Sequence, residues 1–118
     1  MNLEDYRTYC LSKKGVTESI PFSKLPDVLV FKVGGKMFTA TDISTFDSFS
    51  IKCDPETIEE LRAQYPAMEE PAYFSKKHWS RVVVDGSISD MILQEWLDKS
   101  YELVVAKLTK KERNELIR

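Results

Sequence analysis

The fold is decided by the stretch VLVFKVGGKMFTAT, residues 28–41. Two runs of β-forming residues flank Gly34-Gly35, and both positions of such a two-residue turn require positive φ, which glycine adopts without strain. We therefore predict a β-hairpin with strands at 28–33 and 36–41. Side chains alternate along a strand, so one face of the first strand carries Leu29, Phe31 and Val33 and the other carries Val28, Val30 and Lys32.

Three further segments are typical of strands. Phe49, Ile51 and Cys53 alternate with polar neighbours, which is the pattern of a strand with one dry face and one wet face. Tyr73 and Phe74 favour a strand within an otherwise ambiguous segment, and three consecutive valines form the centre of the last run. The strands are predicted at 48–53, 73–74 and 79–85, with turns at 45–47 and 75–78.

Capping residues and apolar repeats of three and four residues predict four helices. Asn2 and Asp54 are the expected N-caps of the first two. Capping boxes at 87–90 and 109–112 precede a long apolar-periodic helix and a short basic one. The helices are predicted at 3–13, at 55–65, over the apolar run 92–108 and from 110 onward, and residues 16–27 are predicted as an ordered loop.

The elements follow the order α-β-β-β-α-β-β-α, with the short helix at the C-terminus. Hairpins without crossovers imply an antiparallel sheet, and helices confined to one face imply a two-layer α+β domain of about five strands. One such domain accounts for the whole chain, 1–118. The other face of the sheet is then uncovered and is a candidate contact surface. It would carry Val28, Val30, Lys32, Ser48, Ser50, Lys52 and Arg81.

The composition is that of a globular protein. With 42% hydrophobic and 31% charged residues, the chain of 118 residues can build its own core without a metal or a disulfide. No apolar run approaches the length of a membrane span, and the acidic N-terminus is unlike a signal peptide. Cys10 and Cys53 lie far apart in the sequence and suit reduced thiols in a cytoplasmic protein.

Three segments form a specific set when they are taken in order. They are LVFKVGGKMF (29–38); IKCDP followed by QYP (51–55 and 64–66); and KKHW followed by DGS and SYELV (76–79, 85–87 and 100–104). Together they resemble the MmcQ/YjbR family of small bacterial proteins, and the resemblance covers nearly the whole chain. It implies an α+β fold with the order given above. It also implies DNA binding, because the family is generally described as DNA-binding.

The candidate site lies around Tyr73–Arg81, which contains the only histidine of the chain together with lysines, an arginine and aromatic residues. A turn at the rim of a sheet can present cations to phosphates, and an aromatic ring beside it can stack on a base. Two purely structural interpretations remain open. Trp79 could be a core anchor beneath the long helix, and the lysines could simply belong to a solvated turn. The candidate contacts are Lys36, Lys52, Lys76, Lys77, His78, Trp79 and Arg81, with Lys110, Lys111 and Arg113 as an extension.

We therefore expect weak, phosphate-directed binding to DNA with little sequence specificity. The net charge is −2, so such binding has to rest on a local patch, and charge is segregated between an acidic segment at 54–70 and a basic one at 107–118. The alternative is a protein interaction module that pairs through the uncovered sheet face with itself or with another protein. A more remote option is a site for a small anion or a metabolite near Lys52 and Arg81.

The sequence shows no arrangement typical of an enzyme. No nucleophile and base are spaced as a pair, and one histidine cannot build a metal site with the two cysteines at any usual spacing. Gly34-Gly35-Lys36 lacks the spacing of a phosphate-binding loop and does not lead into a helix. We expect no catalytic residues, no metal and no cofactor.

Overall fold

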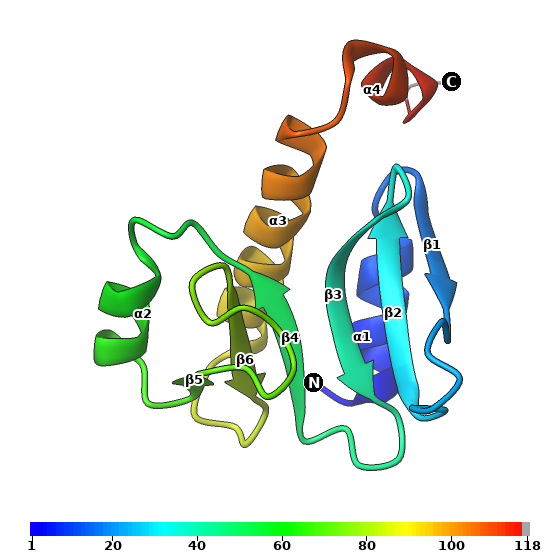
Figure 1. Cartoon of the computed structure of the whole chain (residues 1–118). Coiled ribbons are helices and arrows are strands. Elements are labelled where there is room, and N and C mark those ends of the chain that lie inside the picture. Colours follow the sequence, from blue (N-terminus) through cyan, green and yellow to red (C-terminus); the bar gives the residue numbers. More distant parts are fainter. Residues whose placement is uncertain (117–118) are drawn as a thin grey trace.

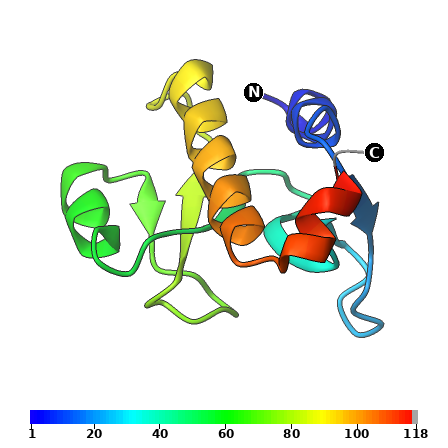
Figure 2. The same cartoon turned by 90° about the horizontal axis from the view of Figure 1, so that it is seen from above.

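The structure, a computed structural model, describes residues 1–116 as six strands and four helices (Figure 1). The strands pair in antiparallel fashion in the order β1-β2-β3-β4-β6-β5, and α1 and α3 lie on the same side of this sheet (Figure 2). The predicted two-layer α+β fold is thus confirmed. The strands are β1 (Val16–Ser19), β2 (Val28–Val33), β3 (Lys36–Asp42), β4 (Ser48–Lys52), β5 (Met68–Glu69) and β6 (Trp79–Val83), and the helices are α1 (Leu3–Leu11), α2 (Ile58–Gln64), α3 (Asp90–Ala106) and α4 (Lys110–Leu116).

The predicted hairpin is present, and it contains a β-bulge that the sequence pattern does not reveal. Its turn is Gly34-Gly35, with φ angles of 59° and 76°. Phe31 pairs with Thr39, but the next residue of β2 pairs with Met37, so Phe38 is the extra residue of the bulge. A bulge lets consecutive side chains share one face. Phe38 and Thr39 are both fully buried, and both serve the core beneath the helices.

Tyr6 of α1 lies at the centre of the core between helix and sheet. The centroid of its ring is 5.1 Å from that of Phe49 and 5.4 Å from that of Phe31. Its hydroxyl lies 2.9 Å from Thr39 Oγ1, so the phenol is buried with a hydrogen-bond partner. Burial raises the pKa of Tyr6 well above its ordinary value, because a phenolate there would be an unsolvated charge.

Ser100 attaches α3 to two strands. Its hydroxyl donates to the carbonyl oxygen of Phe38 at 2.5 Å and accepts from the backbone N–H of Lys52 at 2.8 Å. One small polar side chain in an otherwise apolar helix face thus satisfies a carbonyl group of β3 and an N–H group of β4. The position of α3 over the sheet is therefore set by hydrogen bonds as well as by apolar contacts.

The segment 16–27 begins with a strand, and its prediction as a loop was wrong there. Val16–Ser19 pairs with β2 as the edge strand β1. An edge strand pairs with its neighbour through backbone groups, so its side chains need not show the alternating pattern from which a strand is predicted. Glu18 is held by Arg7 of α1, whose Nε donates to its carboxylate at 2.7 Å.

The strand predicted at Tyr73-Phe74 was also misplaced. The edge strand is β5, where Met68 pairs with Val82 of β6. Phe74 lies in the loop that follows and stacks on Trp79, with 4.9 Å between ring centroids. Aromatic residues are frequent in strands because they pack well on a half-buried surface, and here a loop provides that surface.

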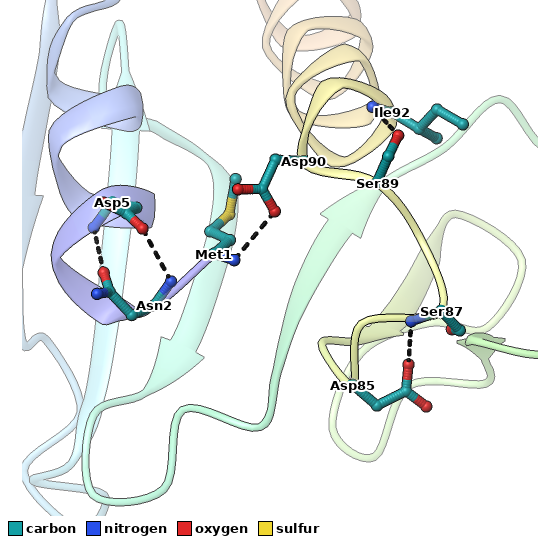
Figure 3. Close-up of polar contacts among 8 residues, drawn as sticks. All are labelled: Met1, Asn2, Asp5, Asp85, Ser87, Ser89, Asp90 and Ile92. Atoms are coloured by element: carbon teal, nitrogen blue, oxygen red, sulfur yellow. Dashed lines mark hydrogen bonds and ion pairs between the residues drawn. The ribbon is translucent and has the colours of Figure 1, made fainter.

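Figure 3 shows how α1 and α3 begin. The side chain of Asn2 accepts from the N–H of Asp5 at 2.8 Å, and the carboxylate of Asp5 accepts from the N–H of Asn2 at 3.2 Å, which confirms Asn2 as a cap. At α3 the predicted box was wrong by two residues, because Ser89 is the N-cap. The N–H of Ser87 instead donates to the carboxylate of Asp85, which closes a separate turn before the helix.

The second helix starts later than predicted, at Ile58. Asp54 does cap a turn, since its carboxylate accepts from the N–H of Glu56 at 2.9 Å, but that turn precedes the helix. The box at the start of α4 is confirmed, because Thr109 and Glu112 exchange hydrogen bonds between side chain and backbone. No helix in the described part of the chain has the length and apolar character that crossing a membrane requires.

We expect Gly34→Ala to destabilise the fold more than Gly35→Ala. Both glycines have positive φ, so each alanine adds a backbone strain of about 1–2 kcal/mol. A Cβ at position 34 would also lie 2.7 Å from Cδ2 of Leu108, whereas nothing lies within 4 Å of a Cβ at position 35. Urea denaturation should show a further loss of roughly 1–3 kcal/mol for Gly34→Ala alone. Equal losses would contradict the close packing of the hairpin turn on Leu108.

Candidate functional site

Lys52, Trp79 and Arg81 occupy alternate positions on the face of the sheet away from α1 and α3, which we call the outer face, whereas Lys36 pairs with the core residue Val33. Two loops, 20–27 and 70–78, project on this side (Figure 2). The expectation of an uncovered face was therefore only partly right. The register places one row of residues across this face, and its centre is buried: Ser19, Val30, Ala40, Ser50, Arg81 and Glu69.

Three lysines converge where the β2–β3 hairpin meets the C-terminal end of α3. Lys36 begins β3, Lys52 ends β4 and Lys107 is the C-cap of α3. The tip of the hairpin and the end of the helix lie at the same end of the sheet (Figure 1). Their approach depends on Gly34, because a side chain there would collide with Leu108. We call Lys36, Lys52 and Lys107 the lysine cluster.

The lysine cluster holds like charges, and no carboxylate of the described residues lies at ion-pair distance. Partial burial lowers the pKa of Lys52, and the charges of Lys107 and Lys36 lower it further. None of the salt bridges within residues 1–116 involves these side chains. The carboxylate of Glu112 accepts from the N–H of Thr109 at 2.9 Å. This hydrogen bond lowers the pKa of Glu112, and the positive charge of Lys36, which lies beyond ion-pair distance, lowers it further. An anion placed among the three ammonium groups would replace repulsion with attraction.

Arg62 of α2 holds the turn that carries Lys76 and Lys77. Its guanidinium donates to the carbonyl oxygen of Lys76 at 2.6 Å, to that of Trp79, and to Ser80 Oγ at 3.2 Å. The side chains of both lysines are exposed. The backbone of this turn is therefore fixed, and its two lysine side chains extend into solvent.

Trp79 does not anchor the strand beneath α3. It pairs with Lys52 across β4 and β6. Side chains alternate along a strand, so the buried neighbour Ser80 faces the core and Trp79 faces away from it. Its half-buried ring stacks on Phe74 at an interplanar angle of 29°. His78 is half-buried as well, and its carbonyl oxygen accepts from the N–H of Cys53 at 2.7 Å. The turn is thereby joined to the end of β4 that carries Lys52.

Arg81 is separated from Lys36 and Lys52, although all three belong to the predicted set. Its Nε donates to Ser48 Oγ at 3.0 Å. Ser48 begins β4 and Lys52 ends it, so the guanidinium is directed toward the opposite end of the strand. The structure thus brings Lys36 and Lys52 together and fixes the turn of Lys76 and Lys77 at the same end, but it gives Arg81 a different environment.

That environment is a groove of about 500 Å³ on the outer face. Ala40, Ser50 and Arg81 contribute to its lining from the strands, and Phe22 and Phe74 contribute from the two loops. Apolar side chains gather around it, with Phe22 40% exposed and Tyr73 78% exposed. Exposed apolar side chains that cluster beside a hollow are typical of a contact surface.

A second cavity, of about 570 Å³, is lined by residues of β4, α2 and α3. Cys53 is among them, and burial raises the pKa of its thiol, so the reactive thiolate is disfavoured at neutral pH. Cys53 and Cys10 are both free and buried. Within residues 1–116 no three His, Cys, Asp or Glu side chains are grouped to hold a metal ion.

Lys107 and Arg62 are the residues of this site that sequence reasoning missed. In the sequence, Lys107 is one of several basic residues near the C-terminus, and Arg62 is the lone cation of an acidic segment. Their partners belong to distant segments, so no local pattern distinguishes them. The predicted extension, Lys110, Lys111 and Arg113, is exposed on α4.

Arg62→Ala should loosen the turn at 76–78. It leaves two carbonyl oxygens without a charged donor, and hydrogen bonds to charged groups contribute about 1.5–3 kcal/mol when they are buried. We expect a loss of roughly 1–2 kcal/mol of unfolding free energy, because Arg62 is partly exposed, and clearly faster tryptic cleavage after Lys76 or Lys77. Arg113→Ala removes an exposed arginine of α4 and is the matched control. Unchanged cleavage in Arg62→Ala would rule out this role.

Known proteins resemble the chain along nearly its whole length. The model of the YjbR family matches residues 11–103. The uncharacterized protein YjbR of Escherichia coli strain K12 is 28% identical over 123 residues, which cover 99% of this chain and 98% of that protein. The uncharacterized protein YbdF of Escherichia coli O157:H7 is 29% identical over 106 residues, which cover 85% of this chain and 87% of that protein.

Solved structures share the fold. Protein DR2400 of Deinococcus radiodurans, with the family-model domain DUF419, matches with a TM-score of 0.89 and 38% identity, over 98% of this chain and 87% of that one. A protein from Pseudomonas syringae matches with a TM-score of 0.75 and 22% identity, over 87% of this chain and 98% of that one. Because the family model covers most of the sequence, the chain belongs to the YjbR family.

Proposed function

We propose that this protein binds DNA weakly, through the phosphates, at the end of the sheet that carries the lysine cluster. The observation that supports it is the meeting of Lys36, Lys52 and Lys107 without a carboxylate partner among the described residues. A phosphate oxygen among these ammonium groups relieves their repulsion, and its negative charge favours the charged form of Lys52. The function that the family resemblance implies is in accord with this chemistry.

The turn lysines extend the contact. Lys76 and Lys77 are exposed at the same end of the sheet, on a backbone that Arg62 holds in place. A fixed turn limits the conformational entropy lost when its lysines meet a phosphate. Trp79 and Phe74 offer an aromatic surface beside the cations, and stacking on such a surface contributes about 1–3 kcal/mol per base in proteins that bind single strands.

The binding we propose is non-specific. A lysine ammonium is a point charge that recognises phosphate and carries little information about base edges. Arg81, whose planar guanidinium suits a bidentate contact with a base, lies in the groove instead. The net charge of −2 repels DNA from the rest of the surface, which keeps the affinity low.

Lys52→Ala should weaken DNA binding more than Lys99→Ala. Both remove one positive charge, but Lys99 is exposed on α3 and pairs with Glu95. In anisotropy titrations of a short labelled duplex, we expect Lys52→Ala to lower the affinity severalfold. We also expect it to reduce the slope of log affinity against log salt by about 0.9, the value for one phosphate contact. Lys99→Ala should leave both close to those of the parent protein.

Two results would contradict the proposal. One is the absence of binding at about 50 mM salt, where phosphate contacts are strong. The other is an equal loss for Lys52→Ala and Lys99→Ala. Light scattering on the same samples distinguishes DNA binding from the alternative, a protein interaction module. A stable dimer that closes over the outer face, and that neither substitution changes, would favour the interaction module.

The pKa of Lys52 provides a test that needs no DNA. A neighbouring positive charge favours the neutral amine, so Lys107→Met should raise the pKa of Lys52 toward its ordinary value of 10.5. Lys99→Met is the control and should leave it unchanged. The ¹³Cε shift of Lys52, followed from pH 8 to pH 12, measures this titration. An unchanged pKa in Lys107→Met would mean that the lysines do not act as a cluster.

A further inference from the structure

Arg81 stands out among the cations of the outer face because of where its guanidinium lies. It is half-buried, it lines the groove, and its Nε donates to Ser48 Oγ at 3.0 Å. Its other N–H groups have no hydrogen-bond or ion-pair partner within residues 1–116. A guanidinium matches a carboxylate in a planar, two-pronged contact. These N–H groups are therefore available to an anionic group of a ligand.

The remainder of the groove suits an aromatic ring. Phe22 and Leu25 line it from the first loop, and Phe74 lines it from the second, where its ring is already stacked on Trp79. Ala40, with its small side chain, lies at the floor. A volume of about 500 Å³ lies within the range of roughly 300–1,000 Å³ that small-molecule sites occupy.

The other charged groups near the groove are carboxylates, which limit the charge that a ligand can carry. Asp42 and Asp47 also line it, and hydrogen bonds from Ser44 lower the pKa of Asp42, so its carboxylate stays ionised. Glu69 is the neighbour of Arg81 across β5 and β6. These carboxylates repel every anion, so binding depends on the direct contact with Arg81, and a doubly charged phosphate ester is disfavoured more than a singly charged carboxylate.

We propose that the groove binds a small aromatic monocarboxylate, with its carboxylate on Arg81 and its ring between Phe22 and Phe74. The site is distinct from the lysine cluster, and it does not depend on whether the protein binds DNA. Ser48, held by the Nε of Arg81, orients the guanidinium. The exposed ring of Tyr73 stands at the rim, where it covers a bound ligand.

The experiment uses indole-3-acetate as the probe and indole-3-acetamide as its neutral match. Each is titrated into the ¹⁵N-labelled full chain, and the signals of the Arg81 Nε–H and of the Ser48 and Ser50 amides are followed. The acid should shift these signals and bind about tenfold tighter than the amide or more, because the two differ only in the charged contact. Methyl phosphate, a small phosphate ester, should bind more weakly in the groove than the acid.

Two variants separate the contribution of the charged contact from that of the aromatic residues that line the groove. Arg81→Gln should reduce the affinity for the acid to that for the amide and should leave the amide unaffected. Tyr73→Ala should weaken both ligands by the same factor. Arg113→Gln, a loss of charge on exposed α4, should change neither. Arg81→Lys keeps the charge without the planar fork and should give an intermediate affinity, so a folded variant remains if Arg81→Gln is unstable.

Three results would overturn the proposal. The first is equal binding of acid and amide, or no binding of either at millimolar concentration. The second is a set of shifts centred on Lys36, Lys52 and Lys107, which would mean that the acid is only a counter-ion of the lysine cluster. The third is a shift of the groove signals on raising the protein concentration alone, which would mean that a second copy of the chain occupies the groove.

Discussion

The buried hydroxyl of Tyr6 is the constraint on which the layered structure depends. A phenol at the centre of an aromatic core needs a hydrogen-bond partner, because an unpaired buried hydroxyl costs about 1–3 kcal/mol. Thr39 supplies that partner, 2.9 Å away, at the point where the bulge at Phe38 turns two consecutive side chains inward. The bulge also presents the carbonyl group of Phe38 to Ser100. One irregularity in β3 therefore holds both α1 and α3.

The position of α3 has a consequence for charge. Once Ser100 fixes the helix over β3 and β4, its C-terminal end meets the β2–β3 hairpin, and Gly34 allows Leu108 to pack on the turn. Lys36, Lys52 and Lys107 are then neighbours. The negative end of the α3 dipole offsets part of their repulsion, but it amounts to only about half a charge. A cluster that has no ion-pair partner among the described residues is the physical basis for the anion binding proposed above.

Much of the fold could be predicted from local sequence. Gly34-Gly35 requires a tight turn, Phe49 and Ile51 alternate strictly, and Asn2 caps the first helix through its own side chain, so each signal lies within a few residues. The edge strands β1 and β5 escaped prediction because they pair through backbone groups, which every residue has. Ser89, not Ser87, caps α3, since the Ser89 hydroxyl accepts from the N–H of Ile92, whereas Ser87 belongs to the preceding turn that Asp85 closes.

The sequence by itself determined the class of the fold, the hairpin, the family and a set of candidate cations. Only the tertiary structure decided how these cations are grouped. It joined Lys107 to Lys36 and Lys52, assigned Arg62 to the backbone of the turn, moved Trp79 to the outer face and set Arg81 apart in a groove. The reason is that helical and strand periodicity are encoded within a few residues, whereas Coulomb interactions depend on distances in space between segments that the chain keeps far apart.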